Sequence, residues 1–129
     1  MGYALSVAHG GGDVVVSDHS GSDDADAVVA EIKAMGRKAA ALQLDAGKVA
    51  TFDAFATTLR AALGDIWQRD SFDALVNNAG HGDYALISDT MEEQFDRLND
   101  VHFKGVFFLT QSCCRCWPTV VVSSTCPPA

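Results

Sequence analysis

The stretch Leu75-Val76-Asn77-Asn78-Ala79-Gly80 decides the fold of this chain. It completes an apolar run over residues 72–77 that is typical of a buried strand, and the run ends in two amide side chains and two small residues. In open sheets of parallel strands, ligands bind beyond the carboxyl ends of the strands, where small residues let a ligand approach the backbone. The stretch therefore predicts a strand that opens onto a ligand site.

Helical and strand-like patterns alternate along the chain, which predicts a parallel sheet with helices on its faces. We expect helices over residues 1–9, 24–35, 49–64 and 96–112, and strands over residues 13–17, 39–44 and 72–77. Thr90-Met91-Glu92-Glu93 resembles a capping box ahead of the last helix. The inner faces are predicted to carry Ala27, Val28, Ile32 and Met35 on the second helix, and Phe52, Phe55, Leu59 and Leu63 on the third.

Length and charge exclude several classes of protein. A chain of 129 residues is enough for one domain. The formal net charge of -8 argues against a nucleic-acid surface, which needs clustered Lys and Arg. The longest apolar stretches, such as Val106-Phe107-Phe108-Leu109, are far shorter than the roughly 18 residues of a membrane span. Met1-Gly2-Tyr3-Ala4-Leu5 does not have the pattern of a signal peptide, so we expect a cytoplasmic protein that binds no membrane.

A glycine triplet and two aspartates bear on ligand binding. Gly10-Gly11-Gly12 lies between a helix and a strand in the wrong order for a phosphate loop, so we interpret it as a helix end and turn. Asp18 follows the strand over residues 13–17, where a carboxylate can accept hydrogen bonds from an adenosine ribose and repel a 2′-phosphate. A solvated loop aspartate is the alternative for Asp18. Asp45, after the strand over residues 39–44, is a weaker candidate.

These segments, in this order and spacing, resemble the short-chain dehydrogenases/reductases over residues 4–112. The resemblance implies an α/β fold, a partial Rossmann-like three-layer sandwich with a parallel sheet. It implies an oxidoreductase that moves hydride between nicotinamide and a carbonyl or alcohol of a small-molecule substrate, with NAD as cofactor and NADP as the alternative. It also implies homo-oligomers formed through the helix over residues 96–112. The cofactor-binding residues implied are Asp18, Asp45, Ala46, Asn77, Asn78, Ala79, Gly80 and Val101.

The chain departs from the family pattern at three places. The first strand and its glycine-rich turn are absent, which predicts a sheet with two open inner edges at its centre. Asp100 stands at the position that we assign to a catalytic asparagine, and an ionised Asp accepts hydrogen bonds but donates none. Neither Tyr3 nor Tyr84 has a Lys four residues later, so the family's tyrosine-lysine pair is missing. We therefore expect a truncated, inactive form, with a non-enzymatic module of weak adenosine-nucleotide affinity as the alternative.

The last seventeen residues have an unusual composition, because they hold all four cysteines: Cys113, Cys114, Cys116 and Cys126. One C-x-x-C supplies too few ligands for a structural zinc ion, and the four histidines are not spaced as ligands, so we predict no metal site. A reading-frame shift after Ser112 would turn the tail into a family-like helix end, strand and serine loop. We interpret residues 1–112 as a partial dinucleotide-binding domain and residues 113–129 as an atypical, frameshifted tail; the coding DNA tests this.

Overall fold

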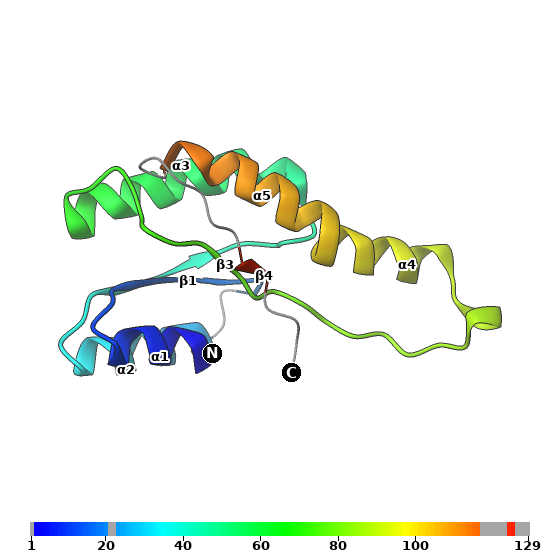
Figure 1. Cartoon of the computed structure of the whole chain (residues 1–129), viewed down its shortest axis with the longest axis horizontal. Coiled ribbons are helices and arrows are strands. Elements are labelled where there is room, and N and C mark those ends of the chain that lie inside the picture. Colours follow the sequence, from blue (N-terminus) through cyan, green and yellow to red (C-terminus); the bar gives the residue numbers. More distant parts are fainter. Residues whose placement is uncertain (1, 21–22, 117–123, 126–129) are drawn as a thin grey trace.

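The computed structural model of the chain describes residues 2–20, 23–116 and 124–125. Helices and strands alternate along most of this length (Figure 1). The longer elements are α1 (Gly2–His9), β1 (Val14–Asp18), α2 (Asp23–Ala34), β2 (Ala39–Gln43), α3 (Phe52–Ala62), β3 (Val76–Asn77), α4 (Glu92–Asn99), α5 (Gly105–Cys113) and β4 (Ser124–Thr125). Short 3₁₀ turns lie at Val49–Thr51, Ile87–Asp89 and Cys114–Cys116, and π-helical turns at Leu63–Trp67 and Asp100–Lys104.

The strands form two separate parallel pairs. β1 pairs with β2 in a register that runs from Val14 opposite Ala39 to Asp18 opposite Gln43. β3 pairs with β4 through Val76 opposite Ser124 and Asn77 opposite Thr125. No ladder joins β1 to β3 in the described part of the chain. Helices α1 and α2 lie on one side of the strands, and α3 and α5 lie on the other (Figure 1). This arrangement confirms the predicted α/β fold, with parallel strands between two layers of helices.

Two apolar clusters hold these layers together. One lies between β1, β2 and the α1–α2 layer, where Ile32 is fully buried. The other lies on the α3–α5 side, where Phe52 is 1% exposed. β-branched Val14, Val15 and Val16 serve both clusters, because successive strand residues point to opposite faces. The core therefore consists of two layers divided by the β1–β2 pair.

The buried face of α2 matches the prediction in part. Val28 and Ile32 are buried as predicted, and Met35 packs partly buried against the same cluster. Ala27, predicted to face inward, is exposed, and Ala25 and Val29 are buried as well. The buried positions follow the i, i+3, i+4, i+7 spacing of a single helix face, and the choice between two overlapping faces depends on where α1 and the strands lie. On α3 the prediction is closer, since Phe52 and Leu59 are buried, as is Leu63 just after it, and Phe55 is partly buried.

The strand predicted over residues 72–77 shortens to Val76–Asn77. Phe72 and Leu75 pack against the α3–α5 cluster, and the Phe72 N–H donates to the Cys116 carbonyl at 2.9 Å. A strand ladder needs a neighbouring strand, and among the described residues β4 pairs with β3 at two positions. The prediction of a buried strand over residues 72–77 is therefore wrong for most of the run: Phe72, Leu75 and Asn77 are only partly buried, and the other three residues are exposed.

The last predicted helix is longer than expected, because α4, the π turn and α5 follow one another without a break from Glu92 to Cys113. It begins after Met91 and not at Thr90, whose hydroxyl donates to the Leu86 carbonyl at 2.9 Å. The Gln94 side chain accepts a 2.9 Å hydrogen bond from the Met91 N–H and so satisfies a free donor at the helix start. α4 extends away from the other layers (Figure 1). Among the described helices, none has the length and apolar character needed to cross a membrane.

Candidate cofactor site

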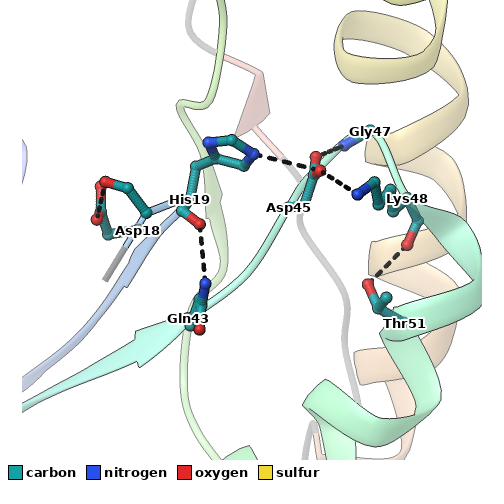
Figure 2. A network of polar contacts seen from close by, with 8 residues as sticks. Asp18, His19, Gln43, Asp45, Gly47, Lys48 and Thr51 are labelled. Atoms are coloured by element: carbon teal, nitrogen blue, oxygen red, sulfur yellow. Dashed lines mark hydrogen bonds and ion pairs between the residues drawn. The ribbon is translucent and has the colours of Figure 1, made fainter. Parts of the chain in front are cut away.

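The ends of β1 and β2 are tied together at one edge of the sheet. The Leu44 N–H donates to the Asp18 carbonyl at 2.9 Å, and the Gln43 side-chain amide donates to the His19 carbonyl at 3.3 Å (Figure 2). The Ser20 hydroxyl donates to an Asp18 carboxylate oxygen at 3.2 Å. Asp18 itself is partly exposed at this edge.

Asp45 organises the loop that follows β2. Its carboxylate accepts a hydrogen bond from the Gly47 N–H at 3.0 Å and lies 3.3 Å from His19 Nε2 and 3.7 Å from Lys48 Nζ (Figure 2). Partial burial by itself would raise the pKa of Asp45, but the Gly47 amide, His19 and Lys48 together hold that pKa below its ordinary value. Asp45 is therefore an ionised structural anchor that joins the two loops.

The long helix packs directly on this loop. A β-carbon added to Gly47 would lie 3.2 Å from Cγ2 of Val101. A β-carbon added to Gly105 would overlap the carbonyl oxygen of Ala46. Glycine at position 105 is thus required by the close approach of helix and loop. This contact brings Val101, Ala46 and the neighbouring Asp45 together; their role in cofactor binding stays a prediction.

The turn after β3 lies at the other side of the site. The Asn77 side-chain amide donates to the Thr110 hydroxyl at 3.5 Å, which links the turn to α5. Asn78 lines an open hollow of about 370 Å³ together with Gly2, Tyr3 and Ser6 of α1. Ala79 and Gly80 are exposed beyond it. The small residues of the turn therefore border open space next to the start of α1.

The helix presents His102 to this turn, and not Asp100. His102 Nε2 lies 2.7 Å from the His81 carbonyl oxygen and 3.2 Å from the His81 amide nitrogen. A β-carbon on Gly80 would lie 2.7 Å from Cε1 of His102. The carboxylate of Asp100 lies 3.9 Å from Lys104 Nζ, one turn further along the helix. The proposed catalytic position at Asp100 stays a prediction, and His102 is a residue at the turn that the sequence pattern missed.

The signal for His102 was weak in the sequence. His81 and His102 are far apart along the chain, and so are His19 and Asp45, so their spacing gives no sign of either contact. Glycine at position 80 was a usable clue, because a residue without a side chain after a strand indicates a close neighbour. The neighbour is the His102 ring, whose centroid is 5.6 Å from that of His81.

The start of the cysteine-rich tail belongs to the core. Cys113 ends α5 within the apolar cluster, and Cys116 is also fully buried and lies 3.9 Å from an Arg60 guanidinium nitrogen. Burial raises the pKa of the Cys113 thiol to about 11, which keeps the thiol protonated and unreactive. No cluster of three metal-ligating side chains occurs in the described ranges, and Cys126 lies outside them. The boundary after Ser112 stays a prediction.

Comparisons with known proteins agree with this geometry. The family model for short chain dehydrogenases matches residues 1–124. An uncharacterized oxidoreductase of Methylorubrum extorquens is 37% identical over 109 residues, which cover 84% of this chain and 42% of that protein. The 3-oxoacyl-[acyl-carrier-protein] reductase FabG of Staphylococcus epidermidis is 36% identical over 104 residues, covering 81% of this chain and 40% of the reductase. The chain belongs to the short-chain dehydrogenase family.

Solved structures of the family superpose well on the chain. The reductase LugOII, described as catalysing keto-reduction at C1 during lugdunomycin biosynthesis, has a TM-score of 0.83 at 31% identity, over 89% of this chain and 48% of that one. A short-chain dehydrogenase of Burkholderia cenocepacia in complex with NADP has a TM-score of 0.77 at 29% identity, over 88% of this chain and 44% of that one. The chain thus spans less than half the length of these relatives.

Proposed function

We propose that this chain forms the adenosine side of an NAD(P) site in a short-chain oxidoreductase. The observation that carries the proposal is the meeting, at one sheet edge, of Asp18 after β1 with the Asp45 loop after β2, which the long helix covers. The carboxyl ends of parallel strands are where such sheets bind dinucleotides.

The residues at this edge fit the adenosine half of a dinucleotide in their chemistry. Asp18 accepts hydrogen bonds from the ribose hydroxyls, because it is partly exposed at this edge and a carboxylate oxygen can accept more than one hydrogen bond. The Ser20 hydroxyl donates to one of these oxygens at 3.2 Å. The same negative charge repels a 2′-phosphate and therefore favours NAD over NADP. Asp45, Ala46 and Val101 border the adenine, with the pKa of Asp45 held low by its fixed partners.

On the other side of the site, Asn77, Asn78, Ala79 and Gly80 form a low wall, because two of these four residues carry little or no side chain. The hollow between Asn78 and α1 provides space next to this wall. NAD, when bound, supplies the hydride acceptor or donor of the reaction. The residues of this chain hold the adenosine end and leave the nicotinamide end to other groups.

We assign the hydride transfer, and its small-molecule substrate, to the whole protein. Neither tyrosine of the 129 residues has a lysine four positions later, so the chain as written has no tyrosine-lysine pair for general acid catalysis. Asp100 at the helix position of the relay accepts protons but donates none when ionised. The 129-residue chain by itself is therefore expected to bind an adenosine nucleotide weakly and to turn over no alcohol or ketone.

Isothermal titration calorimetry of the purified chain with NAD, NADP and adenosine tests this proposal. We expect saturable binding of NAD and adenosine with a Kd of about 1 mM, corresponding to about -4 kcal/mol, and weaker binding of NADP. Asp18→Ala should remove the preference for NAD, whereas the control Asp26→Ala, on the exposed face of α2, should leave it unchanged. Micromolar NAD affinity, measurable turnover, or no heat with adenosine would contradict the proposal.

We also propose that the chain is cytoplasmic and forms homo-oligomers through the helix over residues 96–112. Phe95, Phe103 and Phe107 are 63%, 76% and 62% exposed, and their spacing of multiples of four places them along one face. Exposed aromatic side chains in a row are typical of an interface. Light scattering after size exclusion would measure the mass, and Phe103→Glu should convert an oligomer to the monomer.

A further inference from the structure

The loops after β1 and β2 are joined by a contact that contains two basic side chains. Figure 2 shows the His19 imidazole directed from the end of β1 toward the Asp45 loop. Its Nε2 lies 3.3 Å from Asp45 Oδ2, and Lys48 Nζ lies 3.7 Å from the same oxygen. Because His19 directly follows Asp18, this contact lies beside the carboxylate that we assign to the ribose.

Hydrogen bonds to β2 hold the backbone of His19 in this position. The His19 carbonyl oxygen accepts a hydrogen bond from the Gln43 side-chain amide at 3.3 Å, and the Asp18 carbonyl oxygen accepts one from the Leu44 N–H at 2.9 Å. The side chains of His19 and Lys48 are nevertheless 75% and 71% exposed. The imidazole and the ammonium group therefore face solvent at the edge, where a ligand can reach them.

The net charge of this edge depends on the protonation of His19. Asp18 and Asp45 contribute negative charges and Lys48 contributes a positive charge, so a neutral imidazole leaves the negative charge in excess. Histidine is the side chain that gains a proton between about pH 8 and about pH 5. A protonated His19 then balances the charge of the edge.

The elements next to this edge carry charges of their own. The first turn of α2 adds a negative background, which stays constant over this pH range, from Asp23, Asp24 and Asp26. On the long helix that covers the loop, Asp100 and Lys104 lie 3.9 Å apart and balance each other. His102 of the same helix also titrates as a histidine, but its Nε2 lies 2.7 Å from the His81 carbonyl oxygen, at the turn after β3. A variant of His19 itself therefore separates its effect from that of His102.

We propose that His19 makes the nucleotide preference of this edge depend on pH, because its protonated imidazole admits a 2′-phosphate that the neutral edge repels. The inference rests on the proposed adenosine site. A 2′-phosphate is attached to the ribose that Asp18 binds, so it enters beside His19 and Lys48. A protonated imidazole donates from both ring nitrogens, so one N–H can bind the phosphate while the other stays available to Asp45. A neutral imidazole has a single donor and leaves the repulsion by Asp18 unopposed.

The test is calorimetry of the full 129-residue chain with adenosine and with adenosine 2′-monophosphate, at about pH 8 and at about pH 5.5. The two ligands differ only in the 2′-phosphate, so the ratio of their Kd values isolates its effect. The phosphate also gains a proton in this range, and His19→Gln, whose amide never becomes charged, measures that contribution. From the higher to the lower pH, the Kd of the phosphorylated ligand relative to adenosine should fall at least about threefold further in the original chain than in His19→Gln.

Two further variants assign the effect to the charge at this position. His19→Lys is positively charged at both pH values, so its Kd ratio should be low at both and should change no more than the ratio of His19→Gln. His9→Gln removes a histidine that ends α1, at the opposite end of β1, and should behave like the original chain. In about 0.5 M salt the difference between the original chain and His19→Gln should shrink, because salt screens exposed charges. Circular dichroism checks that the variants fold alike.

Three results would overturn the inference, and they differ in what else they overturn. Saturable adenosine binding, with the same change of the Kd ratio in the original chain and in His19→Gln, would remove the role of His19 and leave the adenosine site in place. An equal loss of the pH effect in His9→Gln and His19→Gln would also remove that role. No binding of either ligand at millimolar concentration would overturn the proposed adenosine site together with this inference.

Discussion

The β1–β2 half and the β3–β4 half of the sheet differ in how far their strands pair. Within the part of the chain that the structure describes, β1 and β2 form five paired positions, whereas β3 and β4 form two. Apolar residues of α1 and α2 cover the first pair on one side, and the α3–α5 cluster covers it on the other. Val76 of β3, by contrast, is 46% exposed.

The difference shows that a strand depends on its neighbours as much as on its own residues. β1 is a β-branched run between two helical layers, so both of its faces are partly covered and its register with β2 is fixed. The run over residues 72–77 pairs with β4 at two positions among the described residues. The four predictions below test this contrast, from the largest expected effect to the smallest.

Removing a large core side chain from the α3 layer should have the largest effect. Phe52 is 1% exposed within the cluster that supports both halves, so Phe52→Ala should lower the free energy of unfolding by about 3–5 kcal/mol. Urea denaturation followed by circular dichroism measures this change. The control Phe103→Ala removes an equally large side chain that is 76% exposed and should change stability by at most about 0.5 kcal/mol. Equal losses would mean that the α3 cluster is not the common core.

The contact of the long helix with the Asp45 loop offers a matched pair of glycine substitutions. Gly105→Ala places a methyl group against the Ala46 carbonyl and should cost about 1–3 kcal/mol. Gly64→Ala meets no atom within 4 Å, and the gain in helix propensity should stabilise the chain by up to about 1 kcal/mol. Thermal unfolding distinguishes the two signs. A neutral Gly105→Ala would show that the helix does not press on this loop.

Asp18 tests whether the end of β1 chooses the cofactor. Replacing its carboxylate by an amide of the same shape, Asp18→Asn, removes the charge that repels a 2′-phosphate, so the ratio of NAD to NADP affinity should fall about tenfold, or about 1.4 kcal/mol. Calorimetry with both cofactors measures the ratio. Asn78→Asp adds a charge on the β3 side, and we expect it to change the ratio less. An unchanged ratio in Asp18→Asn would remove Asp18 from the site.

Acid should lower the stability of the β1–β2 half, because Asp45 becomes protonated. Its pKa is lower in the folded chain than its ordinary value, because the Gly47 amide, His19 and Lys48 outweigh the effect of partial burial. A carboxylate with a lowered folded pKa stabilises the fold above its ordinary pKa of about 4, and this stabilisation is lost as the pH falls through the folded value. Asp45→Asn should therefore flatten the fall in unfolding free energy below about pH 4.

Asp73 provides the control for that measurement in the second half. A hydrogen bond from Arg69 lowers the pKa of Asp73, but its side chain is 78% exposed and solvent screens the pair. Asp73→Asn should change the acid dependence less than Asp45→Asn, and the difference should grow in about 0.5 M salt, roughly three times physiological ionic strength. A larger effect from Asp73→Asn would contradict the assignment of Asp45 as the anchor.

Several elements could be predicted from the sequence because their signals are local. Runs such as Val14–Val16 and the spacing of Phe52, Leu59 and Leu63 reflect the periods of a strand and a helix, and the structure confirms both. The same strand periodicity predicted that Asp18 and Asp45 lie in the loops that follow β1 and β2.

Other features were missed because they depend on contacts between distant parts of the chain. The inward face of α2 includes Ala25 and not Ala27, since α1 and the strands decide which of two overlapping stripes is buried. The approach of His102 to Gly80 and His81 depends on how the long helix crosses the turn. Burial of Cys113 and Cys116 in the core was also outside the reach of a composition argument.

The sequence by itself determined the family, the order of helices and strands, and the strand that ends in Asn77-Asn78-Ala79-Gly80, because these follow from short-range patterns. Only the tertiary structure decided that the strands form two separate pairs, that Gly105 rests on the Ala46 carbonyl, and that His102 lies against the turn. The physical reason is that pairing and packing are set by which surfaces meet, and a chain's local pattern does not specify its neighbours.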